Sequence, residues 1–375
     1  MSHSNPISVL FICPVADVGG AEHSLLELLP HFKEIRPVVM APPGGNLQDR
    51  VRYSGAAFVP APAMGLKKSL NPIILLRNLF RIRRWNAALK EILHREDIAC
   101  VYANGNTAAV YAATASIPLP CGWHSRDLAG VTQTACRMFA PSFQLRVAPS
   151  NLIEAYLTEC GIPAGTVRVV PNPVDPGRFY PGPGSRRRFS IPEDSFVAGM
   201  IAHIAPWKNH YTFIRAAREL MHKDERFFFL IAGRDITGYN QKLTQALNKS
   251  FSDIQRAGRG LWLEDDSDMG ELFRCMDLLV HPAAVEPFGR TIAEAAVSGV
   301  PVLCARAGSL QYLTSESIFS DPELNADRIC EFCLAVQPQQ KALKNAALAG
   351  AAASAEKFDP AEIGAAIENM IREIV

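Results

Sequence analysis

Long hydrophobic runs and early positive charge are both missing from this sequence. No stretch of about 18 apolar residues occurs in the 375-residue chain, so no part of it has the composition of a transmembrane helix. No Lys or Arg precedes Lys33, whereas a secretory signal needs a basic region before its apolar stretch. The apolar run from Ile7 to Cys13 is therefore expected to be a first strand. We expect a cytoplasmic protein, with any membrane contact peripheral on the inner face.

An excess of charge of one sign is lacking too. The chain has 38 Lys and Arg against 37 Asp and Glu, without the basic surplus of a general nucleic-acid binder, so no nucleic acid is expected as a partner. Nine cysteines, an odd number, exclude a complete set of intrachain disulfides. Several, such as Cys13, Cys100 and Cys304, lie among apolar residues, which is typical of buried free thiols in a reducing compartment.

The histidines show no spacing of metal ligands such as H-x3-H, so no metal site is predicted. His23 and His281 are interpreted as ordinary loop or core histidines.

What the sequence has is a regular alternation of short apolar runs with amphipathic stretches such as Glu22–Lys33 and His210–His222. Near-continuous Val, Ile, Leu and Phe runs are typical of parallel strands covered on both faces. The pattern predicts an α/β protein with doubly wound, Rossmann-like layers. The predicted strands are 7–12, 36–41, 99–103, 167–171, 195–202, 227–232, 277–281 and 300–305.

The segment 171–192 carries six prolines and no sustained apolar period, so it is interpreted as an interdomain linker. We expect one domain over 1–180 and a second over 181–359. The last helix, within 360–375, is expected to join the first domain. Ligands of open α/β sheets bind at the carboxyl ends of strands, so the predicted site lies in a cleft between the two domains.

The segment from Glu286 to Val302, EPFGRTIAEAAVSGVPV, carries the densest set of chemically useful residues. A loop with proline and glycine leads into a helix predicted from about Arg290 to Ser298. Gly289 lets a ligand approach the amides at the helix start, and these amides with the helix dipole favour an anion such as diphosphate. A carboxylate accepts two hydroxyl hydrogen bonds, so Glu286 and Glu294 suit a sugar diol. Thr291 and Glu294 also have the spacing of a capping box, and that structural interpretation stays open beside the functional one.

Five further segments of the chain contribute to the pattern. They are VGGAEHSL (Val18–Leu25), Tyr102–Asn104, WHSRD (Trp123–Asp127), VRVVPNPVDPGRF (Val167–Phe179) and IAHIAPWKNH (Ile201–His210). Together with the segment from Glu286, in this order and over nearly the whole chain, they resemble the retaining GT-B glycosyltransferases of family 4, the glycosyl transferases group 1. The resemblance implies two Rossmann-like domains facing each other, a nucleotide diphosphate sugar as donor, and a glycan, lipid-linked or small-molecule acceptor.

The resemblance also implies roles for individual residues. Lys208 would neutralise the diphosphate, and Glu294 would hold the ribose. Glu286, with the amides around Phe288, Gly289 and Arg290, would hold the transferred sugar. The implied catalytic residues are His124, Lys208 and Glu286. The implied donor contacts add Gly20, His203, Gly233, Arg234 and Leu263, the last three near the base; Gly19, Asn104 and Arg126 would face the acceptor.

The chain departs from the family pattern before and after Lys208. Ala202 and His203 stand where Gly-Arg is usual, and Asn209 replaces a glycine. The missing arginine removes a permanent charge and a bidentate fork. A histidine, with its ordinary pKa of about 6.5, would be only partly charged near neutral pH. Arg290 is the nearest candidate to compensate.

Since charge builds on the leaving diphosphate, catalysis is expected to be electrostatic, without a metal, a cofactor or a side-chain nucleophile. The rivals are a nucleotide-sugar epimerase or phosphorylase on the same fold, and a catalytically impaired nucleotide-sugar-binding protein. Asp266-Ser267-Asp268 has a D-x-D form, for which capping of the next helix is the preferred interpretation.

The stretch Arg77–Arg95 is basic and amphipathic. Such a helix can lie on anionic lipid, or it can be the solvated face of a surface helix. Peripheral membrane contact through 77–95 therefore stays open.

Overall fold

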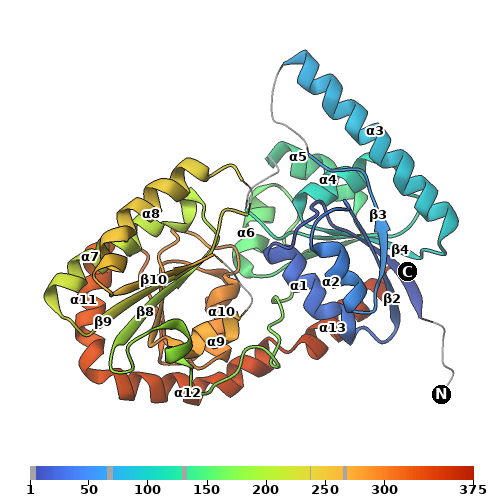
Figure 1. The fold of residues 1–375 in the computed structure, drawn as a ribbon. Helices are drawn as coiled ribbons and strands as arrows, with labels where there is room; N and C mark the ends of the chain where they lie inside the picture. The colour runs from blue at the N-terminus through green and yellow to red at the C-terminus, as the bar shows by residue number, and fades with distance from the viewer. Residues whose placement is uncertain (1–5, 66–70, 129–132, 237, 265–267) are drawn as a thin grey trace. The chain divides into compact units, whose positions relative to one another are not determined.

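The computed structural model describes residues 6–65, 71–128, 133–236, 238–264 and 268–375 (Figure 1). It divides into two compact units. Unit 1 comprises Met1–Pro173 together with Asp359–Val375, and unit 2 comprises Val174–Phe358.

Unit 1 is built on a parallel sheet with the strand order β3-β2-β1-β4-β5-β6-β7. The central strand β1 pairs with β2 on one side and β4 on the other, so the chain winds outward in both directions. The carboxyl ends of β1, β4 and β5 therefore meet at one edge, where loops carry the polar residues of this unit. The strands are β1 Ile7–Ile12, β2 Ile35–Ala41, β3 Ala57–Pro60, β4 Cys100–Asn104, β5 Cys121–His124, β6 Leu145–Ala148 and β7 Arg168–Val169.

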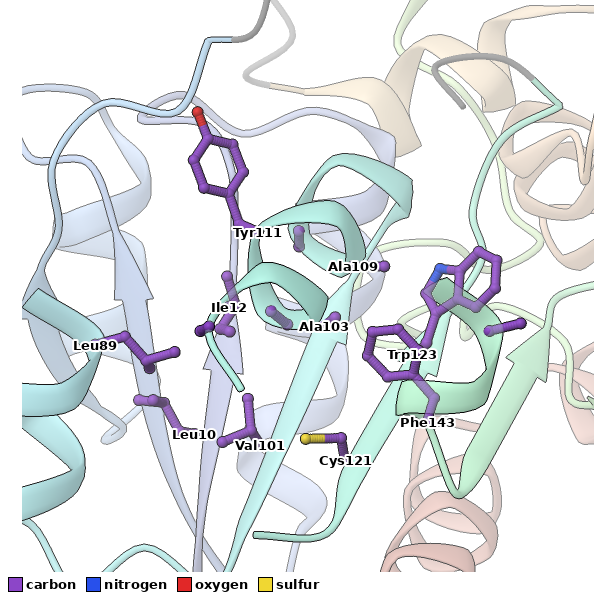
Figure 2. Close-up of a cluster of buried hydrophobic side chains, with 14 of the residues drawn as sticks. Leu10, Ile12, Leu89, Val101, Ala103, Ala109, Tyr111, Cys121, Trp123 and Phe143 are labelled. Atoms are coloured by element: carbon purple, nitrogen blue, oxygen red, sulfur yellow. The ribbon is translucent and has the colours of Figure 1, made fainter. Parts of the chain in front are cut away.

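Helices cover both faces of this sheet. One face packs a cluster that includes Trp85, Tyr111 and Trp123. Figure 2 shows part of this cluster, including Tyr111 and Trp123 with aliphatic residues of β1 and β4. The other face packs α13, whose Glu368 accepts hydrogen bonds from the amides of Lys33 and Glu34 (3.0 and 2.6 Å). The helices are α1 Gly20–Leu28, α2 Leu47–Tyr53, α3 Pro72–Arg95, α4 Asn106–Thr114, α5 Gln133–Phe139, α6 Asn151–Glu159 and α13 Pro360–Arg372, with short 3-10 turns η1 Leu29–His31 and η2 Ala140–Ser142.

Unit 2 repeats the plan with the strand order β10-β9-β8-β11-β12-β13, again with parallel pairs. Its strands are β8 Phe196–Ile201, β9 Phe227–Ala232, β10 Gly260–Leu263, β11 Leu278–His281, β12 Val302–Cys304 and β13 Ile318–Ser320. Its helices are α7 His210–Lys223, α8 Gln241–Arg256, α9 Met269–Cys275, α10 Arg290–Val297, α11 Ala326–Val336 and α12 Gln340–Lys357, with η3 Arg186–Phe189, η4 Pro206–Lys208, η5 Gly308–Tyr312 and η6 Gln337–Gln339. The two-domain Rossmann-like fold predicted from the sequence is confirmed.

The linker expected at 171–192 differs from what the structure shows. Beyond the division after Pro173, this segment packs on unit 2, because Val174, Phe179 and Ile191 enter its hydrophobic core. Arg186 also forms a buried ion pair with Asp277 (2.7 Å). The prolines therefore interrupt regular secondary structure in this segment, but the segment is packed on unit 2 and is not a free linker.

All nine cysteines are free and buried, as expected for reduced core thiols. Cys330 and Cys333 form a Cys-x-x-Cys spacing on α11, and the thiol of Cys330 donates to the carbonyl of Ala216 (3.5 Å). Within the described ranges, no helix is both long and apolar enough to cross a bilayer.

Candidate functional site

Three side chains of unit 2 converge where β8 and β11 end. Lys208, in η4, forms a buried ion pair with Glu286, and His281, the last residue of β11, lies 3.1 Å from the same carboxylate oxygen, Oε2. Burial alone would raise the pKa of Glu286, but Lys208 and His281 outweigh it and hold that pKa at about 2. The carboxylate is therefore ionised throughout the physiological range. His281 is buried, in keeping with its interpretation as an ordinary loop or core histidine, and its ring lies beside the carboxylate of Glu286.

The loop from Glu286 to Gly289 is fixed by backbone hydrogen bonds to the segment after β12. The amide of Glu286 donates to the carbonyl of Arg306 (2.8 Å), and the amide of Ser309 donates to that of Phe288 (2.7 Å). Gly289 has φ +89°, and a Cβ there would lie 3.0 Å from Ile292 and 3.1 Å from Glu286. Only glycine fits this turn without strain, and the turn leads directly into the first amides of α10.

Glu294 lies on α10 and pairs with Arg290 (3.0 Å). The cap residue of α10 is Gly289, so Thr291 and Glu294 both lie inside the helix and cannot form a capping box. The capping alternative for Glu294 is therefore wrong. Arg290, expected to compensate for the missing arginine, is itself engaged by a carboxylate.

His203 lies in the loop after β8, with its ring against that of Trp207 (5.9 Å between centroids). Burial, and then the positive charge of Lys208, lowers its pKa to about 4. The expectation of partial charge near neutral pH is thereby corrected: His203 is neutral there.

Asn209 has φ +64° and ψ +36°, the left-handed conformation that glycine would supply. Asparagine is one of the few other residues that adopt it readily, and the side-chain amide donates to the carbonyl of Pro282 (3.1 Å). The replacement of the family glycine therefore preserves the turn that brings Lys208 to Glu286.

The backbone after β9 closes tightly on its neighbours. Gly233 has φ +147°, and a Cβ there would lie 1.9 Å from the carbonyl oxygen of Ala202. Its amide donates to the carbonyl of Leu263 (2.8 Å), and the indole of Trp262 donates to its carbonyl (3.2 Å). The segment at Gly233 and Arg234 therefore lies between Leu263 and the loop that holds His203. Its predicted role at the base stays a prediction.

In unit 1, Arg126 connects the end of β4 with Asn172, just before the chain passes into unit 2. Its Nε donates to Asn104 Oδ1 (3.1 Å), and its terminal nitrogen donates to Asn172. Asn104 also donates to the carbonyl of Ala21 (3.2 Å) at the start of α1, beside Gly19 and Gly20. The structure thus brings together the residues predicted to face the acceptor.

His124 ends β5 and is completely buried. Its Nδ1 lies 3.0 Å from the hydroxyl of Tyr102, while its Nε2 has no hydrogen-bond partner among the described residues. Burial, with Arg126 nearby, lowers the pKa of His124 well below its usual range, so the ring is neutral.

Glu22 is a buried carboxyl group that the sequence interpretation missed. One of its oxygens accepts a hydrogen bond from the amide of Gly19 (3.1 Å). Burial raises its pKa to about 7, against smaller opposing effects of hydrogen bonds and Arg126. An acidic residue two positions after a glycine pair, in the first turn of a helix, is the signal that could have found it.

Within the part of the chain that the structure describes, no three His, Cys, Asp or Glu side chains gather closely enough to hold a metal ion. Asp266 and Ser267 of the D-x-D segment lie outside the described residues. Asp268, which is described, pairs with Arg188 and precedes α9 without a side-chain cap, so this residue does not fulfil the preferred capping interpretation.

Two protein-family models match the chain. Glycosyl transferases group 1 matches residues 183–329, and Glycosyltransferase Family 4 matches residues 18–178. Together the two matches span most of the chain, and they fall largely in unit 2 and unit 1 respectively.

Among curated proteins, the chain is similar to two D-inositol 3-phosphate glycosyltransferases. It is 29% identical to that of Salinispora arenicola over 157 residues, which cover 38% of this chain and 35% of the relative. It is 27% identical to that of Saccharomonospora viridis over 223 residues, which cover 55% of this chain and 50% of the relative. The chain thus spans half or less of the length of these relatives.

Solved structures of the same architecture cover the chain almost completely. The Anabaena protein HepE, in complex with UDP-glucose, has a TM-score of 0.82 at 20% identity, over 98% of this chain and 100% of that one. A glycosyltransferase from Rickettsia africae has a TM-score of 0.77 at 18% identity, over 99% of each chain. At these identities the likeness shows the fold.

Proposed function

Because the chain belongs to the GT-B glycosyltransferases of group 1 and family 4, we propose that it moves a sugar from a nucleotide diphosphate to an acceptor with retention of configuration. The observation that carries this proposal is the buried Lys208–Glu286–His281 cluster beside the amides of α10. It supplies a cation and helix amides for the diphosphate, and an ionised carboxylate for sugar hydroxyls, within one small region.

The reaction breaks the bond between the anomeric carbon and the diphosphate oxygen. Negative charge grows on the leaving group as the sugar becomes oxocarbenium-like, so a preorganised cation and amides lower the barrier. Lys208 and the amides from Gly289 onward take this role. The acceptor attacks the same face from which the diphosphate leaves, and a diphosphate oxygen takes its proton.

The nucleoside is bound farther along unit 2. Glu294 accepts hydrogen bonds from the ribose diol, and the backbone at Gly233, Arg234 and Leu263 borders the base. Asn104, Arg126 and the start of α1 contact the acceptor, with His124 beside the reacting carbon. We propose that no metal takes part, since cationic side chains and amides provide the charge.

A second candidate is a nucleotide-sugar-binding protein that has lost catalysis. It is favoured by the neutral state of His203 where the family carries arginine, and by the engagement of Arg290 with Glu294. Donor binding with neither transfer nor hydrolysis would identify it.

A thermal-shift screen of nucleoside diphosphates, with and without EDTA, tests the donor half of the proposal. UDP, the nucleotide bound by the Anabaena protein, comes first. A ligand at 100 times its dissociation constant adds about 2.7 kcal/mol of stability. Transfer from the matching nucleotide sugar is then measured, with D-inositol 3-phosphate as the first acceptor because curated relatives are named for it. No shift with any nucleotide would contradict the proposal.

A further inference from the structure

Helix α3 exposes a row of large apolar side chains that no described residue of unit 1 covers. Its first turns extend past α4 and α5 in the view of Figure 1. The exposed side chains, which are between 45% and 68% accessible, are Ile73, Leu75, Leu76, Leu79 and Phe80. Most of them lie before residue 77, outside the stretch that the sequence singled out. We call them the α3 apolar row.

The α3 apolar row lies away from the side of the helix that packs on the core. Ile73, Leu76 and Phe80 follow the i, i+3, i+7 spacing of one helical face, and Leu75 and Leu79 border it. Trp85, Leu89 and Ile92 mark the opposite, buried side. The helix therefore has two apolar stripes, only one of which the fold uses.

Positive charge accompanies the row. No acidic residue occurs between Pro72 and Lys90, and the first one, Glu91, pairs with Arg95 (3.7 Å). Arg77, Arg83 and Arg84 form no ion pair with any residue that the structure describes. Arginines with long apolar stems beside leucines and a phenylalanine suit a boundary between water and lipid.

We propose that the α3 apolar row, with Arg77, Arg83 and Arg84, docks on an anionic lipid surface. The positive charge favours anionic lipid over a second copy of this chain as the partner of this surface. A second copy would bring the same unpaired arginines against each other. The helix lies in the interface with its apolar side chains among the acyl chains and its guanidinium groups at the phosphates. This inference is independent of the transferase proposal, because lipid binding needs no donor and no turnover.

Co-sedimentation of the full chain with vesicles tests the proposal. We expect binding to phosphatidylcholine vesicles that contain phosphatidylglycerol, little binding to phosphatidylcholine alone, and release at high salt. Arg77→Gln/Arg83→Gln/Arg84→Gln should weaken partitioning on the order of 100-fold, because each cation near the surface contributes severalfold. Leu76→Ser/Phe80→Ser should weaken it as well. The matched control, Lys242→Gln/Lys249→Gln/Lys341→Gln, removes three exposed cations from unit 2 and should leave binding unchanged.

A fluorophore locates the contact. Because all nine native thiols are buried, Ile73→Cys gives one accessible labelling site for an environment-sensitive dye. Its emission should rise and shift to the blue on addition of anionic vesicles, whereas a dye at Lys249→Cys should not respond. The proposal is overturned if the wild type does not bind, if the triple arginine variant binds as well as the control, or if light scattering shows that the row joins two chains in solution.

Discussion

The ammonium group of Lys208 and the carboxylate of Glu286 form a buried ion pair, although the proposed mechanism assigns them to different parts of the donor. When the donor binds beside them, the ion pair would be replaced by two interactions. Lys208 would contact the diphosphate, and Glu286 would contact the sugar. Both side chains are already out of bulk water and held by neighbouring groups, so little reorganisation is needed during the reaction.

Replacing Lys208 tests the electrostatic role directly. Lys208→Ala should lower the transfer rate by about 10²–10³, the usual cost of losing one preorganised charge donor. The pKa of Glu286 should rise, because the main effect holding it down is lost. Transfer assays and nucleotide affinity are the measurements, with circular dichroism to show an intact fold. Lys208→Ala with full turnover would remove this residue from the mechanism.

His203 predicts a pH dependence of nucleotide binding. Its pKa is about 4 when it faces Lys208 and His281, and a bound diphosphate would raise it. Since the complex then has the higher pKa, this contribution to binding is complete below about pH 4 and is lost as pH rises through the raised pKa of the complex. Calorimetry in buffers of different ionisation enthalpy should show proton uptake by the wild type above pH 4. His203→Arg should show none and keep its affinity at alkaline pH, whereas equal uptake by both proteins would mean that His203 does not sense the phosphates.

The sequence predicted the parallel sheets because buried strands such as Phe227–Ala232 are uniformly apolar, and those bounds match the structure. Short strands such as Cys121–His124 and Gly260–Leu263 were not among the predicted ones, since four residues give no readable period. Partners across long sequence distances were not predictable either. Lys208 and Glu286 are 78 positions apart, and nothing local to His281 shows that it faces the same carboxylate.

Because the pKa of Glu22 is raised in the folded protein, we expect its contribution to the stability of unit 1 to fall as pH rises. An acid whose pKa is raised by folding stabilises the fold fully below its ordinary value and loses that contribution through its folded value, here between about pH 4.5 and 7. Glu22→Gln keeps the acceptor for the Gly19 amide but cannot ionise. It should flatten the stability profile over this range in urea titrations. The exposed Glu159→Gln is the control, and identical slopes for wild type and Glu22→Gln would contradict a buried neutral carboxyl group.

Substitutions of Glu294 and Thr291 can distinguish a role in ligand binding from a role in helix capping. Glu294→Gln removes a charged acceptor and should weaken nucleotide binding by about 10- to 100-fold, the range for a hydrogen bond to a charged group. Its free energy of unfolding should fall only through the lost ion pair with Arg290, because Gly289 and not Thr291 caps α10. Thr291→Ala should leave nucleotide affinity close to that of the wild type. If each variant instead lost about 1 kcal/mol of stability, and the double variant lost less than the sum, the two side chains would form a capping box after all.

Gly233, in the segment proposed to border the base, and Gly258 both have positive φ, so Gly258 can serve as the control position for Gly233. At Gly233 a methyl group would lie 1.9 Å from the carbonyl oxygen of Ala202, whereas at Gly258 it would meet nothing within 4 Å. Gly258→Ala should therefore cost only the backbone strain of a left-handed alanine, about 1–2 kcal/mol. Gly233→Ala carries a steric clash as well, so it should cost more in urea unfolding and should also weaken nucleotide binding. Equal costs would show that the segment after β9 can move to accept a methyl group, and that it is too loose to define one face of a base site.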